Sequence, residues 1–226
     1  MKMAAKRALV AVDYNQLNCF SSVVLYDIAH TSTRKTYKNK FNVERIIHRR
    51  KTSNDFEYLI KWEGWALDQC TWEPTEHLTP ELLRSYEKPL KPNLGRLEEA
   101  SRQFYSGVLS ALRAKSLAPF YVMFDLDLWR YVSNNRGCDS QHKGYKLYCI
   151  EDLALLNLPE QWWNYLNNHG QGQAVKPPLK IKPILSWTPA TQVFKDGKLI
   201  ARQRMPLEKL CVDILRRPCD TANLFQ

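Results

Sequence analysis

The chain has 226 residues, of which 44% are hydrophobic and 12% aromatic, and 33 Lys and Arg against 23 Asp and Glu give a net charge of +10. This composition excludes disorder throughout, and the length allows one large domain or two small ones. Six irregularly spaced cysteines are too few for a disulfide scaffold and indicate free thiols. The apolar run 8–12 is too short for a signal peptide, and no stretch reaches the ~18 apolar residues of a membrane span, so we expect a soluble, intracellular protein.

Positive charge is unevenly distributed along the chain. Residues 1–40 carry a net charge of +5, residues 91–116 carry +3 and residues 171–226 carry +6, whereas 41–90 and 117–170 each carry −2. Basic segments around nearly neutral ones favour contact with a polyanion, for which nucleic acid is the commonest partner. The alternative is a set of solvated surface lysines, and composition alone does not decide between the two.

The first half of the chain predicts an arm, a small sheet and a helix. We interpret residues 1–37 as a basic, loosely structured N-terminal arm. Alternating apolar residues and turn residues then predict three strands, near 41–46, 56–62 and 70–73. Thr79 before Pro80 provides the N-cap and first position of a short helix that ends near Pro89.

The second half is predicted in four parts: an amphipathic helix over 91–116, an α+β module over 117–170, a linker over 171–183, and a hairpin followed by a helix over 184–226. Apolar residues recur every three or four positions from Leu94 to Leu112, which is typical of a helix with one buried face.

Three finer predictions concern this second half. In the α+β module we expect a long strand over 120–129, paired with a strand over 145–150, and a short helix after Pro159. Asp196-Gly197 predicts a hairpin turn. Apolar residues at helical spacing after Pro206 predict the final helix.

The most informative residues lie in the predicted small sheet. Four runs occur in order, namely FNVERII from Phe41, EYLIKWEGW from Glu57, TWEP from Thr71, and the apolar helix residues between Leu82 and Glu87. Over about residues 38–90 the sequence resembles the chromodomain family, of the heterochromatin-protein-one and Polycomb type. The resemblance implies an α+β fold with a curled three-stranded antiparallel sheet and a C-terminal helix, followed here by a smaller α+β region of uncharacterised type.

The resemblance also implies a site that binds methylated lysine on a histone tail. Phe41, Trp62 and Trp65 match the three positions of the family's aromatic cage. A methylated ammonium keeps its charge but loses hydration, so it favours the faces of aromatic rings. The histone peptide would lie as an added strand between residues 38–43 and the segment after Pro74. The implied peptide-binding residues are Asn42, Val43, Gln69, Glu76 and His77.

Several positions depart from the family's pattern. Lys38 and Lys40 stand where the best-known members carry acidic residues, and Gln69 replaces an acidic residue near the methylammonium. His77 replaces a common Asn, and Phe41 and Trp65 each replace a more usual Tyr. These differences leave the target lysine and its methylation state open, and they leave the cage intact.

Other chemistry has weaker support. A zinc set of Cys138, His142, Cys149 and His169 lacks the paired short spacings of a structural site. Asp125 and Asp127 are expected on a solvated strand face. Because the sequence contains no nucleophile elbow or phosphate loop, we expect neither enzyme activity nor a cofactor nor a metal.

We therefore expect a nuclear, heterochromatin-associated regulator of transcription that recognises a methylated tail of histone three, with no membrane contact. Residues 94–217 are expected to bind a protein partner or to self-associate. For residues 117–170, a chromoshadow-like dimerisation module is one option and a packing module that braces the chromodomain is the other. Two alternatives stay open for the whole chain. One is a nucleic-acid-binding protein, of retroelement origin, that uses its basic flanks, and the other is a non-enzymatic scaffold.

Overall fold

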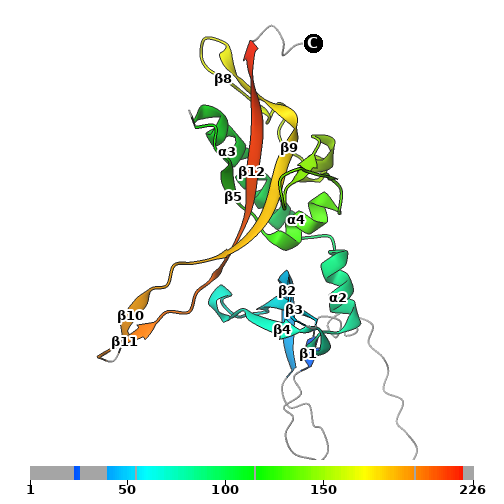
Figure 1. Cartoon of the computed structure of the whole chain (residues 1–226), viewed down its shortest axis with the longest axis vertical. Helices are drawn as coiled ribbons and strands as arrows, with labels where there is room; N and C mark the ends of the chain where they lie inside the picture. Colours follow the sequence, from blue (N-terminus) through cyan, green and yellow to red (C-terminus); the bar gives the residue numbers. More distant parts are fainter. Residues whose placement is uncertain (1–22, 26–39, 54, 115, 196, 221–226) are drawn as a thin grey trace, which may run out of the picture.

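The computed structural model describes residues 23–25, 40–53, 55–114, 116–195 and 197–220. An N-terminal unit from β1 to α2 and a C-terminal unit from α3 to β12 lie one above the other (Figure 1). Among the described helices, none combines the length and the apolar character needed to cross a membrane.

The N-terminal unit is an antiparallel sheet with a helix. The sheet has the strand order β1-β2-β3-β4. Its strands are β1 (Val23–Leu25), β2 (Lys40–Lys51), β3 (Phe56–Trp62) and β4 (Thr71–Pro74), with the 3₁₀ turns η1 (Leu67–Gln69) and η2 (Thr75–His77) around β4. Strands β2 to β4 confirm the predicted three-stranded sheet. β1 is an additional strand that lies inside the predicted N-terminal arm. The rest of that arm lies outside the described residues.

Helix α2 (Pro80–Glu87) follows the predicted pattern at its start. The Thr79 side chain accepts a hydrogen bond from the Leu82 backbone N–H, as an N-cap residue does. Leu82 and Tyr86 are buried against Val43, Ile60 and the other members of the sheet's core. This packing fixes the helix across one face of the sheet.

The C-terminal unit is a second sheet, with α3 (Leu94–Arg113) and α4 (Leu126–Ser133) packed on it. The strands are β5 (Phe120–Met123), β6 (Cys138–Asp139), β7 (Lys146–Tyr148), β8 (Asn164–Leu166), β9 (Gln171–Trp187) and β12 (Pro206–Asp220), and a 3₁₀ segment η3 (Glu151–Leu156) follows β7. The order is β5-β12-β9-β7-β6, with β8 beside β9. One core joins the two helices and η3 to the sheet through fully buried residues such as Phe104, Val132 and Leu153.

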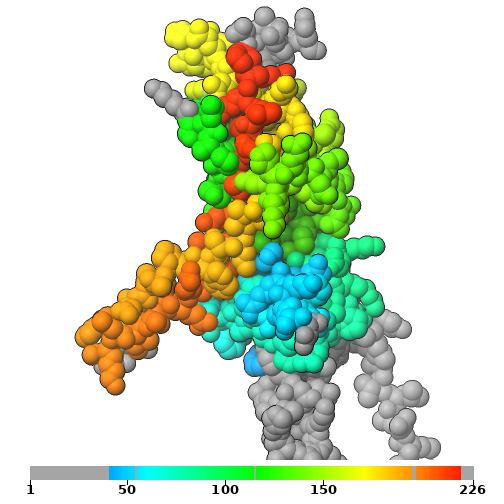
Figure 2. Space-filling view, viewed as in Figure 1, coloured from blue at the N-terminus to red at the C-terminus, as the bar shows by residue number. Residues whose placement is uncertain are grey.

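β9 and β12 continue beyond the sheet toward a hairpin of β10 (Gln192–Lys195) and β11 (Lys198–Ala201), which projects from both units (Figure 2). Helix α3 and this hairpin confirm two sequence predictions. Gly197, in the hairpin turn, has a φ of +77°, the left-handed conformation that favours glycine at this position.

The predicted linker over 171–183 and the predicted final helix are wrong. Both segments are strands, β9 and β12, that pair with each other along nearly their whole lengths. The apolar residues of β12 fit helical spacing, but Leu210 and Val212 also alternate and are both fully buried. Because the partner strand is distant in sequence, local spacing cannot reveal the pairing that decides between the two structures.

The predicted strand over 120–129 is also wrong in its second half. β5 ends at Met123, and residues from Leu126 form α4, whose Trp129 is buried although strand alternation places it outward. β5 pairs with β12, and β7 pairs with β6 and β9, so the expected pairing between 120–129 and 145–150 does not form. The helix expected after Pro159 is replaced by a turn with Gln161 at a φ of +59°, a conformation that a helix does not allow.

Candidate functional site

Three aromatic rings gather at one end of β3. Phe41 lies near the start of β2, Trp62 ends β3, and Trp65 lies in the turn that follows. The Phe41 ring centroid is 6.2 Å from that of Trp62 and 6.1 Å from that of Trp65, with interplanar angles of 69° and 81°. Trp65 is 50% exposed and Phe41 36%, whereas Trp62 is 6% exposed. We call these three residues the aromatic cluster; it has two accessible rings and one buried ring.

Hydrogen bonds fix the turn that carries Trp65. The buried Lys61 ammonium donates to the carbonyl oxygens of Trp62 at 2.9 Å and Trp65 at 2.6 Å, and it pairs with Glu44 at 2.6 Å. Gly64, between the two tryptophans, has a φ of +76°, which a glycine adopts without strain. The backbone at both tryptophans is therefore held in place, and sequence reasoning did not identify Lys61 as its support.

A second chain of bonds fixes the Trp62 ring. Its indole N–H donates to the Thr71 hydroxyl at 3.1 Å, and that hydroxyl donates to Glu73 at 2.6 Å. The other Glu73 oxygen lies 2.9 Å from Nδ1 of His77. His77, a predicted peptide-binding residue, is thus linked to the aromatic cluster through side chains of β4.

The remaining predicted peptide-binding residues lie in different settings. Asn42 is exposed on β2, and its carbonyl oxygen accepts a bond from the Glu63 N–H at 3.0 Å. Val43 is buried in the sheet's core, so only its backbone is available to a ligand. Gln69 and Glu76 are exposed, at the end of η1 and within η2.

The outer edge of β2 carries a strand from the same chain. β1 pairs antiparallel with β2 over Lys40–Asn42, and Val24 lies opposite Phe41. This edge is where the family resemblance places an added peptide strand. Sequence reasoning assigned β1 to a loosely structured arm, because three apolar residues in a polar segment give only a weak strand signal.

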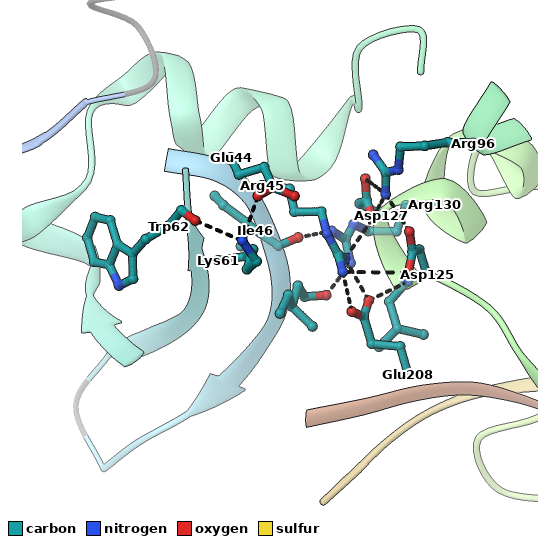
Figure 3. A network of polar contacts seen from close by, with 12 residues as sticks. Glu44, Arg45, Ile46, Lys61, Trp62, Arg96, Asp125, Asp127, Arg130 and Glu208 are labelled. Carbon is teal, nitrogen blue, oxygen red and sulfur yellow. Dashed lines mark hydrogen bonds and ion pairs between the residues drawn. The ribbon is translucent and has the colours of Figure 1, made fainter. Parts of the chain in front are cut away.

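A network of ion pairs joins the two units (Figure 3). The Arg45 guanidinium, on β2, bonds Glu208 of β12 at 2.6 Å and 2.9 Å and Asp127 of α4 at 2.9 Å. Arg96 of α3 bonds Asp127 and, at 2.6 Å, Asp125. We call these five residues the junction network. Asp125 and Asp127 therefore lie between the two units, and their predicted place on a solvated strand face is wrong.

Burial shapes the electrostatics of this junction. Burial alone would lower the pKa of Arg45, but its hydrogen bond and ion pair with Glu208 outweigh this and raise the pKa. Glu208 is only 6% exposed and also accepts a bond from the Leu126 N–H at 2.7 Å. The buried Glu208 carboxylate therefore has both a cation, Arg45, and a backbone N–H, that of Leu126, as partners.

Arg130 of α4 makes a second contact with the N-terminal unit. It donates to the carbonyl oxygens of Ile46 and Ile47 on β2, and its guanidinium carbon lies 4.1 Å from the Tyr86 ring centroid. Burial lowers the pKa of Arg130. The pKa of His48 is also lowered, first by burial and to a smaller extent by the positive charge of Arg130, so this imidazole is neutral near pH 7. Leu185 and Trp187 of β9 also pack against the cluster of Ile47, Leu59 and Cys70, so apolar contacts join the two units in addition to the polar ones.

Comparison with known proteins gives matches to the N-terminal unit. The family described as "Chromo (CHRromatin Organisation MOdifier) domain" matches residues 41–89. "Chromobox protein homolog hpl-1" of Caenorhabditis elegans is 34% identical over 71 residues, which are 31% of this chain and 39% of that protein. "Chromobox protein homolog 6" of Mus musculus is 45% identical over 49 residues, 21% of this chain and 12% of that protein.

Longer matches extend beyond the N-terminal unit. "Histone-lysine N-methyltransferase SUV39H1-A" of Danio rerio is 26% identical over 147 residues, which are 64% of this chain and 34% of that protein. The chain spans less than two fifths of the length of each of these three relatives. No solved structure matches the chain. The matched segment coincides with β2 to α2 and carries the aromatic cluster, so residues 41–89 of this chain form a chromodomain of the chromobox type.

Proposed function

We propose that this protein binds chromatin by recognising a methylated lysine of a histone tail with the aromatic cluster. The observation that carries the proposal is the arrangement of Phe41, Trp62 and Trp65, whose rings meet nearly at right angles while two of them stay accessible. Ring faces attract a desolvated cation by about 0.5–2 kcal/mol each. In this proposal the protein acts in the nucleus by binding and needs neither catalysis nor a cofactor.

The bonds around the aromatic cluster support this role. Lys61 holds the Trp65 turn and Thr71 holds the Trp62 ring, so the rings are oriented before a ligand arrives. A site that is already ordered loses little entropy on binding. The substitutions at Gln69 and His77 leave open which histone lysine is recognised, and histone three is the first candidate.

Removing the most exposed ring tests the proposal directly. Trp65→Ala is expected to weaken binding of a trimethylated histone-tail peptide about tenfold, because one ring face is lost, and to leave binding of the unmodified peptide unchanged. The measurement is a calorimetric titration of the full chain with peptides that carry zero to three methyl groups.

Phe41→Ala and Phe56→Ala form a matched pair for the same titration. Both phenylalanines are 36% exposed, but only Phe41 belongs to the aromatic cluster. Phe56, on β3, lies beside Arg49 of β2. We expect Phe41→Ala to lose methyl-dependent affinity and Phe56→Ala to retain it. Equal binding of all methylation states by the unaltered chain would contradict the proposal.

Strand β1 affects how a peptide reaches this site. A peptide that adds a strand beside Lys40–Asn42 has to replace β1, which pairs there already. Val24→Pro removes a backbone donor and disfavours this strand, so it is expected to raise peptide affinity about fivefold, the equivalent of about one net hydrogen bond. The same titration measures this effect. The gain in affinity is expected for every methylation state, because β1 and the peptide compete for the edge of β2 and not for the rings. An unchanged affinity would contradict this competition.

A further inference from the structure

The two faces of the C-terminal sheet differ in what covers them. Val122, Ile181 and Leu210 are buried in the core that includes α3 and α4. Because side chains alternate along a strand, their sequence neighbours point to the opposite face. That face carries Tyr121 and Met123 of β5, Lys180 and Lys182 of β9, and Lys209, Cys211 and Asp213 of β12, and Tyr145 lies beside Cys211. We call these eight residues the open face.

Two tyrosines lie on either side of Cys211 on the open face. Tyr121 is paired with Cys211 in the sheet, and Cys211 is paired with Lys182. The Tyr145 hydroxyl lies 3.2 Å from the Cys211 sulfur. Tyr121 is 64% exposed, so at least one of the two rings presents a large accessible surface. The two tyrosines therefore share Cys211, which is 3% exposed, as a neighbour.

Each of these rings has a lysine next to it. The Lys209 ammonium lies 5.8 Å from the Tyr121 ring centroid, and the Lys182 ammonium 5.6 Å from that of Tyr145. Gly144 gives room for the Lys182 side chain, since a Cβ at Gly144 would lie only 3.0 Å from Lys182 Cε. The Lys182 side chain thus packs against Gly144, and its ammonium lies beside the Tyr145 ring.

The charge of the open face selects the kind of ligand. Its three lysines face one acid, Asp213, which pairs with Lys180 at 3.2 Å. The Tyr145 phenol is neutral near pH 7, as an ordinary tyrosine is, and its hydrogen bond with Cys211 raises its pKa further, to about 12. A cationic peptide would be repelled here, whereas an anion with flat rings matches both the lysines and the tyrosines.

We propose that the open face binds single-stranded nucleic acid, with bases stacked on Tyr121 and Tyr145 and phosphates paired with Lys182 and Lys209. Aromatic rings on a sheet combined with lysines suit this ligand because each base offers a ring face and each nucleotide a negative charge. A duplex keeps its bases stacked inside and offers the tyrosines nothing to stack on. This surface is separate from the aromatic cluster, and its lysines belong to the basic segment 171–226.

The test is a fluorescence-anisotropy titration of the full chain with labelled 12-nucleotide poly(U) and poly(dT), and with a 12-base-pair duplex of the same label. Tyr121→Ala is expected to weaken single-strand binding about tenfold through lost stacking. Phe194→Ala, which removes a ring that is 71% exposed on the projecting hairpin, is its matched control and is expected to have no effect. Circular dichroism establishes that each variant is folded.

A charge variant gives a second, independent measurement. Lys182→Ala is expected to reduce the slope of log affinity against log salt concentration by about 0.7, the value for one lost contact with a single strand. Lys51→Ala, which removes an exposed lysine at the end of β2, should leave the slope unchanged. Absence of binding, tighter binding of the duplex, or equal effects of Tyr121→Ala and Phe194→Ala would overturn the proposal. So would equally tight binding of a poly-glutamate peptide, since that would indicate a surface selective for charge alone.

Discussion

Replacing Arg45 with alanine is expected to lower the free energy of unfolding by about 3–5 kcal/mol, the range observed when one partner of a buried ion pair is removed. Arg45 bonds Glu208 and Asp127 at distances of 2.6–2.9 Å, and these carboxylates are 6% and 17% exposed. Without the guanidinium, Glu208 loses its ion pair in a poorly solvated place, while Asp127 keeps the one with Arg96. Because the three residues come from β2, α4 and β12, the loss is expected to loosen the junction between the chromodomain and the C-terminal unit.

Urea denaturation followed by circular dichroism measures this effect, and two further variants define its cause. Arg102→Ala breaks an exposed pair with Glu99 on α3 and should leave the unfolding midpoint nearly unchanged. In the double variant Arg45→Ala, Glu208→Gln, part of the lost stability should return, since the carboxylate that lost its ion pair is gone while Asp127 still pairs with Arg96. A cost for Arg45→Ala no larger than that for Arg102→Ala would show that the junction network contributes nothing to stability.

The junction network illustrates which features local sequence could not predict. Arg45, Asp127 and Glu208 lie in three segments, β2, α4 and β12, that are far apart in the sequence. Nothing in the immediate neighbourhood of Asp127 distinguishes a carboxylate that faces water from one that faces a distant arginine. The same reason explains why β12 was predicted as a helix: its apolar residues satisfy both periods, and pairing with β9, which ends 19 positions before β12 begins, decides between them.

The chromodomain was predictable because its signals are local. The strands alternate, the turns carry turn residues, and Thr79 caps α2 as its position before Pro80 predicts. The aromatic cluster was found by resemblance, since ring type and spacing alone would have favoured packing in the core. Its supports were not found, because the role of Lys61 depends on how the turn after β3 brings the Trp65 carbonyl to it, and the role of Thr71 depends on the pairing of β4 with β3.

Replacing Trp62 with alanine is expected to cost stability as well as binding. Trp62 is only 6% exposed and belongs to the core that includes Tyr58, Ile60 and Leu82, so it serves as packing and as one ring of the aromatic cluster. Deleting a buried tryptophan side chain typically lowers the free energy of unfolding by about 3–5 kcal/mol. Trp65→Ala, at a site that is 50% exposed, should change this free energy by less than about 1 kcal/mol.

Comparing these two variants separates folding from recognition. Urea denaturation gives the stability of each variant, and titration with the trimethylated peptide gives its affinity. Trp62→Phe retains a ring but lacks the indole N–H that donates to Thr71 at 3.1 Å. We therefore expect a free energy of unfolding between those of the unaltered chain and Trp62→Ala, and weakened methyl-dependent binding. If Trp62→Ala were as stable as Trp65→Ala, the buried role of Trp62 would be refuted. If Trp65→Ala unfolded the chain, the exposed ring would have to be assigned to the fold, and lost binding could no longer be attributed to the missing ring face.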